Sequence, residues 1–314
     1  MDKDSIVLVT GANSGIGKAA AIALGRMGAN VVMLCRDKGR GEEALHDIKK
    51  QCGSHKIELM LCDLSSLKSI NSFCDEFLKK YKRLDVLINN AGTLKQVRRE
   101  TEDGYELSLA VNYLAVFLLT NRLLPLLKAS APSRIVNVSS FGHRWGKIHF
   151  NDINITKHYT ALKAYSQSKL AEVMFTYSLA ESLKGTGVTV NAADPGIVGT
   201  DIVVNRETGF GTLASRMQKL LFRSPEKGAE TAVWLASSPD VEGVTGKFFV
   251  RRRAARSSKC SYDKNAAKRL WQMSEIMTGL KCEDQGTARN YGEAQAEEGM
   301  TAEVLSVSSR ENGV

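Results

Sequence analysis

Thr10-Gly11-Ala12-Asn13-Ser14-Gly15-Ile16-Gly17 ends an apolar run and opens a helical pattern. The run before it, Ser5–Thr10, is rich in β-branched residues, which is typical of a buried strand. Residues 15–28 after it carry Ala and Leu at helical spacing. Glycines between a strand and a helix permit a tight turn and close approach of a ligand, and the helix N-terminus offers free N–H groups to phosphate. The stretch predicts a pyrophosphate-binding turn, with an ordinary glycine-rich turn as the alternative.

Strand-like and helix-like segments alternate along the rest of the chain. Apolar strands separated by helices form parallel sheets that are covered on both faces. The fold class expected is therefore α/β, a Rossmann-type doubly wound parallel sheet in a single domain. Strands are expected at Ser5–Thr10, Asn30–Cys35, Lys56–Cys62, Asp85–Asn89, Arg134–Ser139, Val188–Ala193 and Lys247–Val250, and helices at Gly15–Gly28, Glu42–Lys50, Leu67–Tyr81, Leu107–Leu127, Ala164–Leu183 and Pro225–Ala236.

Composition divides the chain near Cys282. The 314 residues are 43% hydrophobic and 25% charged, as in ordinary globular proteins. From Cys282 to Val314 the sequence is rich in Glu, Gly, Ser and Ala and poor in large apolar residues. Such a segment buries too little surface to offset its ordering entropy. We expect one folded domain over residues 1–281 and a disordered tail over residues 282–314.

Further motifs follow the glycine turn in a fixed order. They are Asp63 after the third strand, Asn89-Asn90-Ala91-Gly92 after the fourth, Tyr165-Ser166-Gln167-Ser168-Lys169 in a helix, and Pro195-Gly196 after the sixth strand. With them, the chain from about Ser5 to Val250 resembles the short-chain dehydrogenase/reductase family, whose glycine motif is TGxxxGIG. The segment Gly142–Lys163 resembles that of the retinol dehydrogenase-like branch. The resemblance implies an oxidoreductase that interconverts a carbonyl and an alcohol with a nicotinamide cofactor.

The end of the second strand bears on which cofactor is bound. NAD sites place an acid there for the ribose 2′-OH, whereas this chain has Arg36, whose guanidinium suits a 2′-phosphate. Arg40 and Lys18 add positive charge nearby, so NADP(H) is expected, with NAD(H) as the alternative if Arg36 is solvated and Asp37 reaches the ribose. The cofactor site expected from the motifs comprises Gly11, Asn13, Ser14, Gly15, Ile16, Gly17, Arg36, Asp63, Leu64, Asn89, Ala91, Gly92, Tyr165, Lys169, Pro195 and Gly196.

Tyr165 and Lys169 are four residues apart, so they share one face of a helix. A phenol has a pKa near 10, and a nearby ammonium stabilises its ionised form, which suits it to acid–base work. The family resemblance implies that Lys169 also binds the nicotinamide ribose. It also implies that Ser140, the second serine of its pair, bonds the substrate oxygen and that Asn112 supports a water beside the lysine. Ser139 is then a local backbone partner.

The net charge, the cysteines, the histidines and one apolar segment bear on which ligands or macromolecules the protein binds. The net charge of +9 favours polyanions, but the basic run Arg251–Arg253 has no interleaved aromatics, so nucleic acid is not expected. Neither the cysteines nor His143, His149 and His158 show metal-ligand spacing, and we interpret these histidines as loop residues near the pocket mouth. The apolar segment Ile197–Ser224 suggests a lid over a small hydrophobic substrate, with ordinary core packing of a helix as the alternative.

The sequence and the family resemblance also give expectations for the cellular location and the oligomeric state of the protein. No signal peptide is apparent and no run reaches the length of a membrane span, so a cytoplasmic protein without a transmembrane segment is expected. The resemblance implies a homodimer or homotetramer. The alternative from another class is a non-catalytic NADP(H)-binding regulator or scaffold on the same fold, because fold alone does not establish activity.

Overall fold

The computed structural model describes residues 3–196 and 223–280. Inter-residue contacts divide the chain into two compact units, Met1–Trp271 and Gln272–Val314, and the whole sheet lies in the first. The expected tail, 282–314, lies outside the described residues, as does the expected lid Ile197–Ser224 apart from its last two residues.

The sheet has eight strands in the order β3-β2-β1-β4-β5-β6-β7-β8. All neighbours pair in parallel except β7 and β8. The chain leaves β1 in one direction through β2 and β3 and returns to β4 on its other side, which creates the switch point where doubly wound sheets bind ligands. The strands are β1 (Ile6–Thr10), β2 (Asn30–Cys35), β3 (Ile57–Leu61), β4 (Val86–Asn89), β5 (Ser133–Val138), β6 (Val188–Asp194), β7 (Phe248–Val250) and β8 (Arg253–Ala255).

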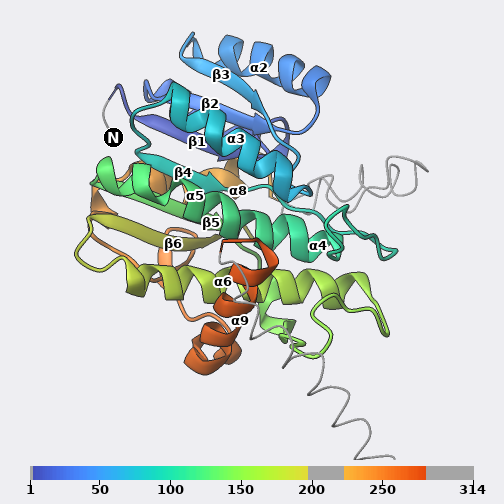
Figure 1. The fold of residues 1–314 in the computed structure, drawn as a ribbon. Helices are drawn as coiled ribbons and strands as arrows, with labels where there is room; N and C mark the ends of the chain where they lie inside the picture. The colour runs from blue at the N-terminus through green and yellow to red at the C-terminus, as the bar shows by residue number, and fades with distance from the viewer. Residues whose placement is uncertain (1–2, 197–222, 281–314) are drawn as a thin grey trace, which may run out of the picture. The chain divides into compact units, whose positions relative to one another are not determined.

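Helices cover both faces of this sheet, which confirms the Rossmann-type fold. Figure 1 shows α3, α5 and α6 across one face, while α1 packs against α2 and α8 on the other. The elements are α1 (Gly15–Arg26), α2 (Lys38–Cys52), α3 (Leu67–Lys80), α4 (Leu107–Leu109), the π-helical turn η1 (Ala110–Leu114), α5 (Ala115–Ala129), the 3₁₀ turn η2 (Phe141–Trp145), α6 (Ala161–Ser182), α8 (Pro225–Ser237), the 3₁₀ turns η3 (Pro239–Val241) and η4 (Lys259–Tyr262), and α9 (Lys264–Met277).

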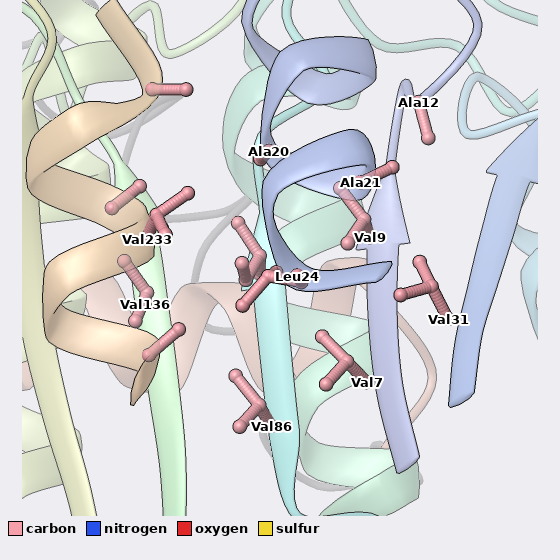
Figure 2. Close-up of a cluster of buried hydrophobic side chains, with 14 of the residues drawn as sticks. Val7, Val9, Ala12, Ala20, Ala21, Leu24, Val31, Val86, Val136 and Val233 are labelled. Carbon is pink, nitrogen blue, oxygen red and sulfur yellow. The ribbon is translucent and has the colours of Figure 1, made fainter. Parts of the chain in front are cut away.

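The core between β1 and α1 explains why the glycine turn is held rigidly. Val7 and Val9 of β1 are fully buried and point toward α1, as Figure 2 shows. On the helix, Ala20 and Ala21 are also buried, and their small side chains let α1 approach the sheet closely. Because the strand and the helix are both anchored in one core, the turn between them has a fixed position.

The edge strand β8 has no counterpart among the expected strands and runs antiparallel to β7. It pairs with β7 through a two-residue hairpin in which Arg251 and Arg252 have φ of +51° and +59°. Such turns favour Gly or Asn at these positions, so arginines carry no sequence signal for the hairpin. The basic run is exposed, as expected for a solvated surface, and Arg252 pairs with Glu230 at 2.8 Å.

One helix among the described residues, Leu107–Ala129, is long and apolar enough to cross a membrane by composition. Its best window has a mean hydropathy of 1.5, but 72% of that window is buried inside the fold. It comprises α4, η1 and α5, and it packs against α3 and the sheet. The hydropathy of this helix is therefore that of a core helix.

Candidate active site

The glycine turn is clamped to the loop after β4. Thr10 Oγ1 accepts hydrogen bonds from the backbone N–H groups of Asn90 and Ala91 at 2.8 and 2.9 Å. Asn90 Nδ2 in turn donates to Thr10 O at 2.8 Å. Gly11 adopts φ of +67°, and a Cβ there would lie 3.0 Å from Ala91 Cα. The two loops are thus in direct contact at the switch point of the sheet.

The first turn of α1 is open toward a ligand. Ser14 is the N-cap of the helix, and its side chain makes no capping hydrogen bond. A helix N-terminus without such a cap has free N–H groups and the positive end of the helix dipole, which together bind an anion. The sequence-predicted Asn13 and Ser14 lie at this point, so the residues present fit a pyrophosphate.

A pocket of about 220 Å³ adjoins this turn, and its lining includes Asn13, Ser14, Lys18 and Arg40. Two of these four side chains are cationic, although Lys18 also pairs with Asp47 outside the lining. Arg40 likewise pairs with Asp37 at 3.5 Å, and Glu43 also lines the pocket, so the lining combines two cations with one acid. Arg36 is exposed one residue past the end of β2 and is not part of the lining.

Asp37, on which the NAD alternative depends, makes a local hydrogen bond at the start of α2. Its carboxylate is the N-cap of α2, where Oδ1 accepts the backbone N–H of Arg40 at 2.9 Å. That hydrogen bond, with the charge of Arg40, lowers the pKa of Asp37. Oδ1 of this carboxylate is thus engaged in a local hydrogen bond, and Asp37 is not part of the pocket lining.

Two other predicted cofactor residues have visible structural partners. Asp63 Oδ1 accepts from the backbone N–H and the hydroxyl of Ser65 at 2.9 and 2.6 Å, which orders the loop that continues into Leu64. Asn89 points into the core, where Nδ2 donates to Thr120 and Asn137. The side chain that bonds the glycine turn is instead that of Asn90, which motif matching did not single out.

The predicted catalytic serine and tyrosine meet at Gly142. Ser140 is the N-cap of η2, and its Oγ accepts the backbone N–H of Gly142 at 3.1 Å. A Cβ on Gly142 would lie 3.1 Å from Tyr165 Cε1 and 3.5 Å from Ser140 Oγ. The two side chains therefore border the same glycine. Ser139, by contrast, is buried, with its Oγ directed to the carbonyl of Lys169 at 3.5 Å.

Lys169 follows Tyr165 by about one turn of α6 and is almost fully buried. Its Nζ donates to Val138 O at 2.8 Å and to Glu172 Oε2 at 3.0 Å. Burial alone would lower the pKa of Lys169, but the charge of Glu172, with contributions from Tyr165 and Asp194, outweighs burial and raises it. The side chain is therefore a fixed ammonium beside Tyr165.

Asn112 connects the loop after β4 to α6 from within the π-helical turn η1. Its Oδ1 accepts the backbone N–H of Thr93 at 2.7 Å, and its Nδ2 donates to Thr93 O and to Ser168 Oγ at 3.0 and 2.9 Å. Ser168 Oγ donates to Tyr165 O at 2.8 Å. Asn112 thus holds the helix that carries Tyr165, and π-helical turns are frequent at functional sites.

The interpretation of His143 as a loop residue near the pocket mouth is wrong. It is fully buried, with Nδ1 at 2.7 Å from Ser140 O and Nε2 accepting the backbone N–H of Ser258 at 3.1 Å. This bonding assigns the proton to Nδ1, and burial lowers the pKa of His143, which keeps the ring neutral. The histidine therefore fixes the backbone of Ser140, three residues earlier.

Pro195 and Gly196 directly follow β6, which ends at Asp194. Asp194 before them is buried, and its Oδ1 accepts the backbone N–H of Gly196 at 2.7 Å. Burial raises the pKa of Asp194. Among the described residues, no group of three or more His, Cys, Asp or Glu could hold a metal ion.

The glycine turn leads to a testable consequence at Gly17. A Cβ there would lie 2.5 Å from Gly11 O and would also overlap Asn90 Nδ2. Gly17→Ala should therefore displace the clamp and lower the free energy of unfolding by about 1–3 kcal/mol, with weaker nucleotide binding. Chemical denaturation and nucleotide titration measure the two effects. Gly39→Ala is the matched control, because a Cβ there has no neighbour closer than 3.7 Å. Equal stability of the Gly17 variant and the parent would contradict the geometry.

Comparison with known proteins agrees with this arrangement. A family model described as short chain dehydrogenase matches residues 5–209. Retinol dehydrogenase 14 of Homo sapiens is 45% identical over 291 residues, covering 87% of this chain and 86% of the relative.

Solved structures share the fold at similar coverage. An uncharacterised protein from Mycobacterium paratuberculosis matches with a TM-score of 0.71 and 32% identity, covering 88% of this chain and 93% of its own. A short chain dehydrogenase from Shigella flexneri, solved in complex with NADP, matches with a TM-score of 0.61 and 27% identity, covering 80% and 98%. The chain therefore belongs to the short-chain dehydrogenase family of oxidoreductases, which bind a nicotinamide cofactor, and within it is retinol dehydrogenase-like.

Proposed function

We propose that this protein is an NADP(H)-dependent oxidoreductase that interconverts a carbonyl and an alcohol on a hydrophobic substrate of retinoid, prenyl, steroid or other lipid-derived type. The observation that carries the proposal is the convergence of Ser140 and Tyr165 on Gly142, with the Lys169 ammonium close enough to Tyr165 to interact with its charge. A purely nucleotide-binding protein needs the glycine turn but has no use for this second group of side chains.

Each side chain has a defined part in the proposed reaction. Ser140 bonds the substrate oxygen and orients it, and Tyr165 gives a proton to a carbonyl oxygen or removes one from an alcohol. Lys169 stabilises the ionised phenol and binds the cofactor ribose, while Asn112 holds the helix that carries both. The bound cofactor supplies or accepts the hydride.

The hydrophobic character of the substrate is supported beside Ser140. Phe141 and Trp145 of η2 are 48% and 64% exposed, with ring centroids 5.3 Å apart in an edge-on arrangement. Exposed aromatic rings beside a candidate catalytic group are suited to apolar ligands. We expect kcat/KM to rise with chain length across a series of aldehydes reduced with NADPH. A preference for short polar aldehydes would argue against the hydrophobic substrate class.

The preference for NADP(H) rests on charge. Arg36 and the pocket residues Lys18 and Arg40 favour a 2′-phosphate, while Asp37 Oδ1 is engaged as the N-cap of α2 and Glu43 is the one acid in the pocket lining. The Shigella flexneri relative has NADP bound in its structure, which is consistent with this choice.

The cofactor preference can be reversed by a single change. NADPH should bind more tightly than NADH, and Arg36→Asp should shift the preference toward NADH by removing a phosphate partner and adding repulsion. Fluorescence titration of both cofactors measures the ratio of the two dissociation constants. Lys79→Asp, an exposed substitution on α3 with the same change in charge, should leave that ratio unaltered. Equal affinity of the parent for both cofactors would refute the assignment.

A further inference from the structure

A buried carboxylate, Glu172, lies one turn beyond Lys169 on α6. It is 1% exposed, and its Oε2 accepts a hydrogen bond from Lys169 Nζ at 3.0 Å. Its other oxygen, Oε1, is buried without a hydrogen-bond partner among the described residues. Burying a polar atom without a partner costs free energy, so a group of this kind calls for a functional explanation.

The ammonium of Lys169 has three N–H donors, and two have assigned acceptors. One is Glu172 Oε2, and the other is Val138 O, at the end of the strand that leads into Ser140. Glu172 and β5 together therefore fix the position of Nζ and leave one donor for the cofactor side. The carboxylate also supplies a negative charge that compensates the ammonium in the interior.

Few titratable groups act electrostatically on the pair formed by Lys169 and Glu172. Tyr165 on α6 and Asp194 at the end of β6 act on Lys169 together with Glu172, and the η2 residue His143 acts on Asp194. Lys169 is the charged group that acts on Glu172 among the described residues. Burial raises the pKa of Glu172 to about 7, because the attraction of Lys169 only partly offsets the loss of hydration.

We propose that Glu172 is a positioning residue that controls how much positive charge Lys169 presents to Tyr165, an inference that rests on the proposed function. With Glu172 ionised, the pair is neutral overall. With Glu172 protonated, or replaced by a neutral residue, the ammonium is uncompensated and stabilises the phenolate more strongly. Glu172 therefore sets the pH range in which Tyr165 works as base or acid.

The test is the pH profile of turnover in both directions. Glu172→Gln keeps the shape and hydrogen-bonding capacity of the side chain but removes its charge. The midpoint of the profile should move to lower pH by about one unit, for alcohol oxidation and carbonyl reduction alike. Glu172→Asp keeps the charge farther from Nζ and should give a smaller shift in the same direction. A merely structural role would change the rate and leave the midpoint in place.

Glu181→Gln is the matched control, because Glu181 on the same helix pairs with Lys184 at the same spacing but in solvent. Its profile should coincide with that of the parent. If Glu172→Gln does not fold, the graded shift of Glu172→Asp decides. A parental midpoint in a folded, active Glu172 variant overturns the inference and leaves the proposed function standing. If the parent neither binds NADPH nor reduces any carbonyl, the proposed function fails, and this inference fails with it.

A second readout needs no substrate. The pKa of Glu172 in the folded protein is about 7, above its ordinary value of 4.5. The stability linked to the protonated carboxyl is therefore fully present below the ordinary value and is lost as pH rises through 7. Relative to Glu172→Gln, the parent should lose unfolding free energy between about pH 5 and about pH 8. A constant difference between the two across this range would contradict the titration of Glu172 near pH 7, whereas the inference itself is decided by the turnover profiles.

Discussion

Tyr165→Phe is expected to lower turnover by about 10²–10⁴-fold, the usual effect of losing a general acid or base, while NADPH binding remains intact. The substitution removes the hydroxyl that exchanges the proton with substrate and keeps the ring that packs against Gly142. The glycine turn, Arg36 and Lys169 are untouched, so the cofactor keeps its partners. Steady-state rates and a nucleotide titration on the same preparation separate the two effects.

The matched control is Tyr177→Phe on the same helix. Tyr177 shares a hydrogen bond with Ser257 Oγ at 2.7 Å, away from Ser140 and Lys169. Its loss should reduce stability slightly and leave turnover unchanged. Parental turnover in Tyr165→Phe would mean that the proton comes from another group, and the mechanism proposed for Tyr165 would be wrong.

Lys169→Met is expected to abolish turnover and also to destabilise the fold by about 3–5 kcal/mol at alkaline pH, where Glu172 is ionised. The ammonium is the charged partner of the buried Glu172, so its removal leaves an unpaired carboxylate in the interior. The loss should be smaller in acid, where Glu172 is protonated both with and without Lys169 and the missing charge matters less. Denaturation curves at several pH values measure the effect.

A double variant separates the structural from the chemical part of this result. Lys169→Met combined with Glu172→Leu replaces the buried ion pair by apolar side chains, an exchange that is often neutral or stabilising. Stability should return, whereas turnover and cofactor affinity should remain low. If the double variant regained activity, Lys169 would not support Tyr165 or the ribose in the way proposed here.

Most of the sheet could be predicted because its strands are apolar runs bounded by turn residues. Each of the seven expected strands corresponds to an observed one, because burial on both faces gives parallel strands a continuous apolar sequence. The strand β8 escaped prediction because Arg253–Ala255 is exposed and follows a hairpin made of arginines. The helix α9 (Lys264–Met277) was also not predicted, although Asp263, whose Oδ1 accepts the backbone N–H groups of Asn265 and Ala266, is a readable cap signal before it.

The residues of the site were easier to predict than their partners. Tyr165, Lys169 and the glycine turn belong to motifs with fixed spacing, so the sequence alone identifies them as candidate site residues. Glu172 carries no such motif, although its spacing of three from Lys169 on a helix predicts contact. Its burial could not be anticipated, because every residue of α6 from Ser166 to Thr176 is buried and the helix has no polar face to contrast with an apolar one.

Reduction of a carbonyl by the parent protein, coupled to oxidation of NADPH, most directly tests the claim that the protein is an NADP(H)-dependent oxidoreductase. The purified chain would be incubated with NADPH and a panel of hydrophobic aldehydes and ketones that includes retinal, and alcohol formation and NADPH loss would be measured in the same sample. The proposed function predicts one alcohol formed for each NADPH consumed with at least one member of the panel, at a rate about 10²–10⁴-fold lower with Tyr165→Phe. Tight NADPH binding without product from any member would contradict it and would favour a non-catalytic nucleotide-binding protein on the same fold.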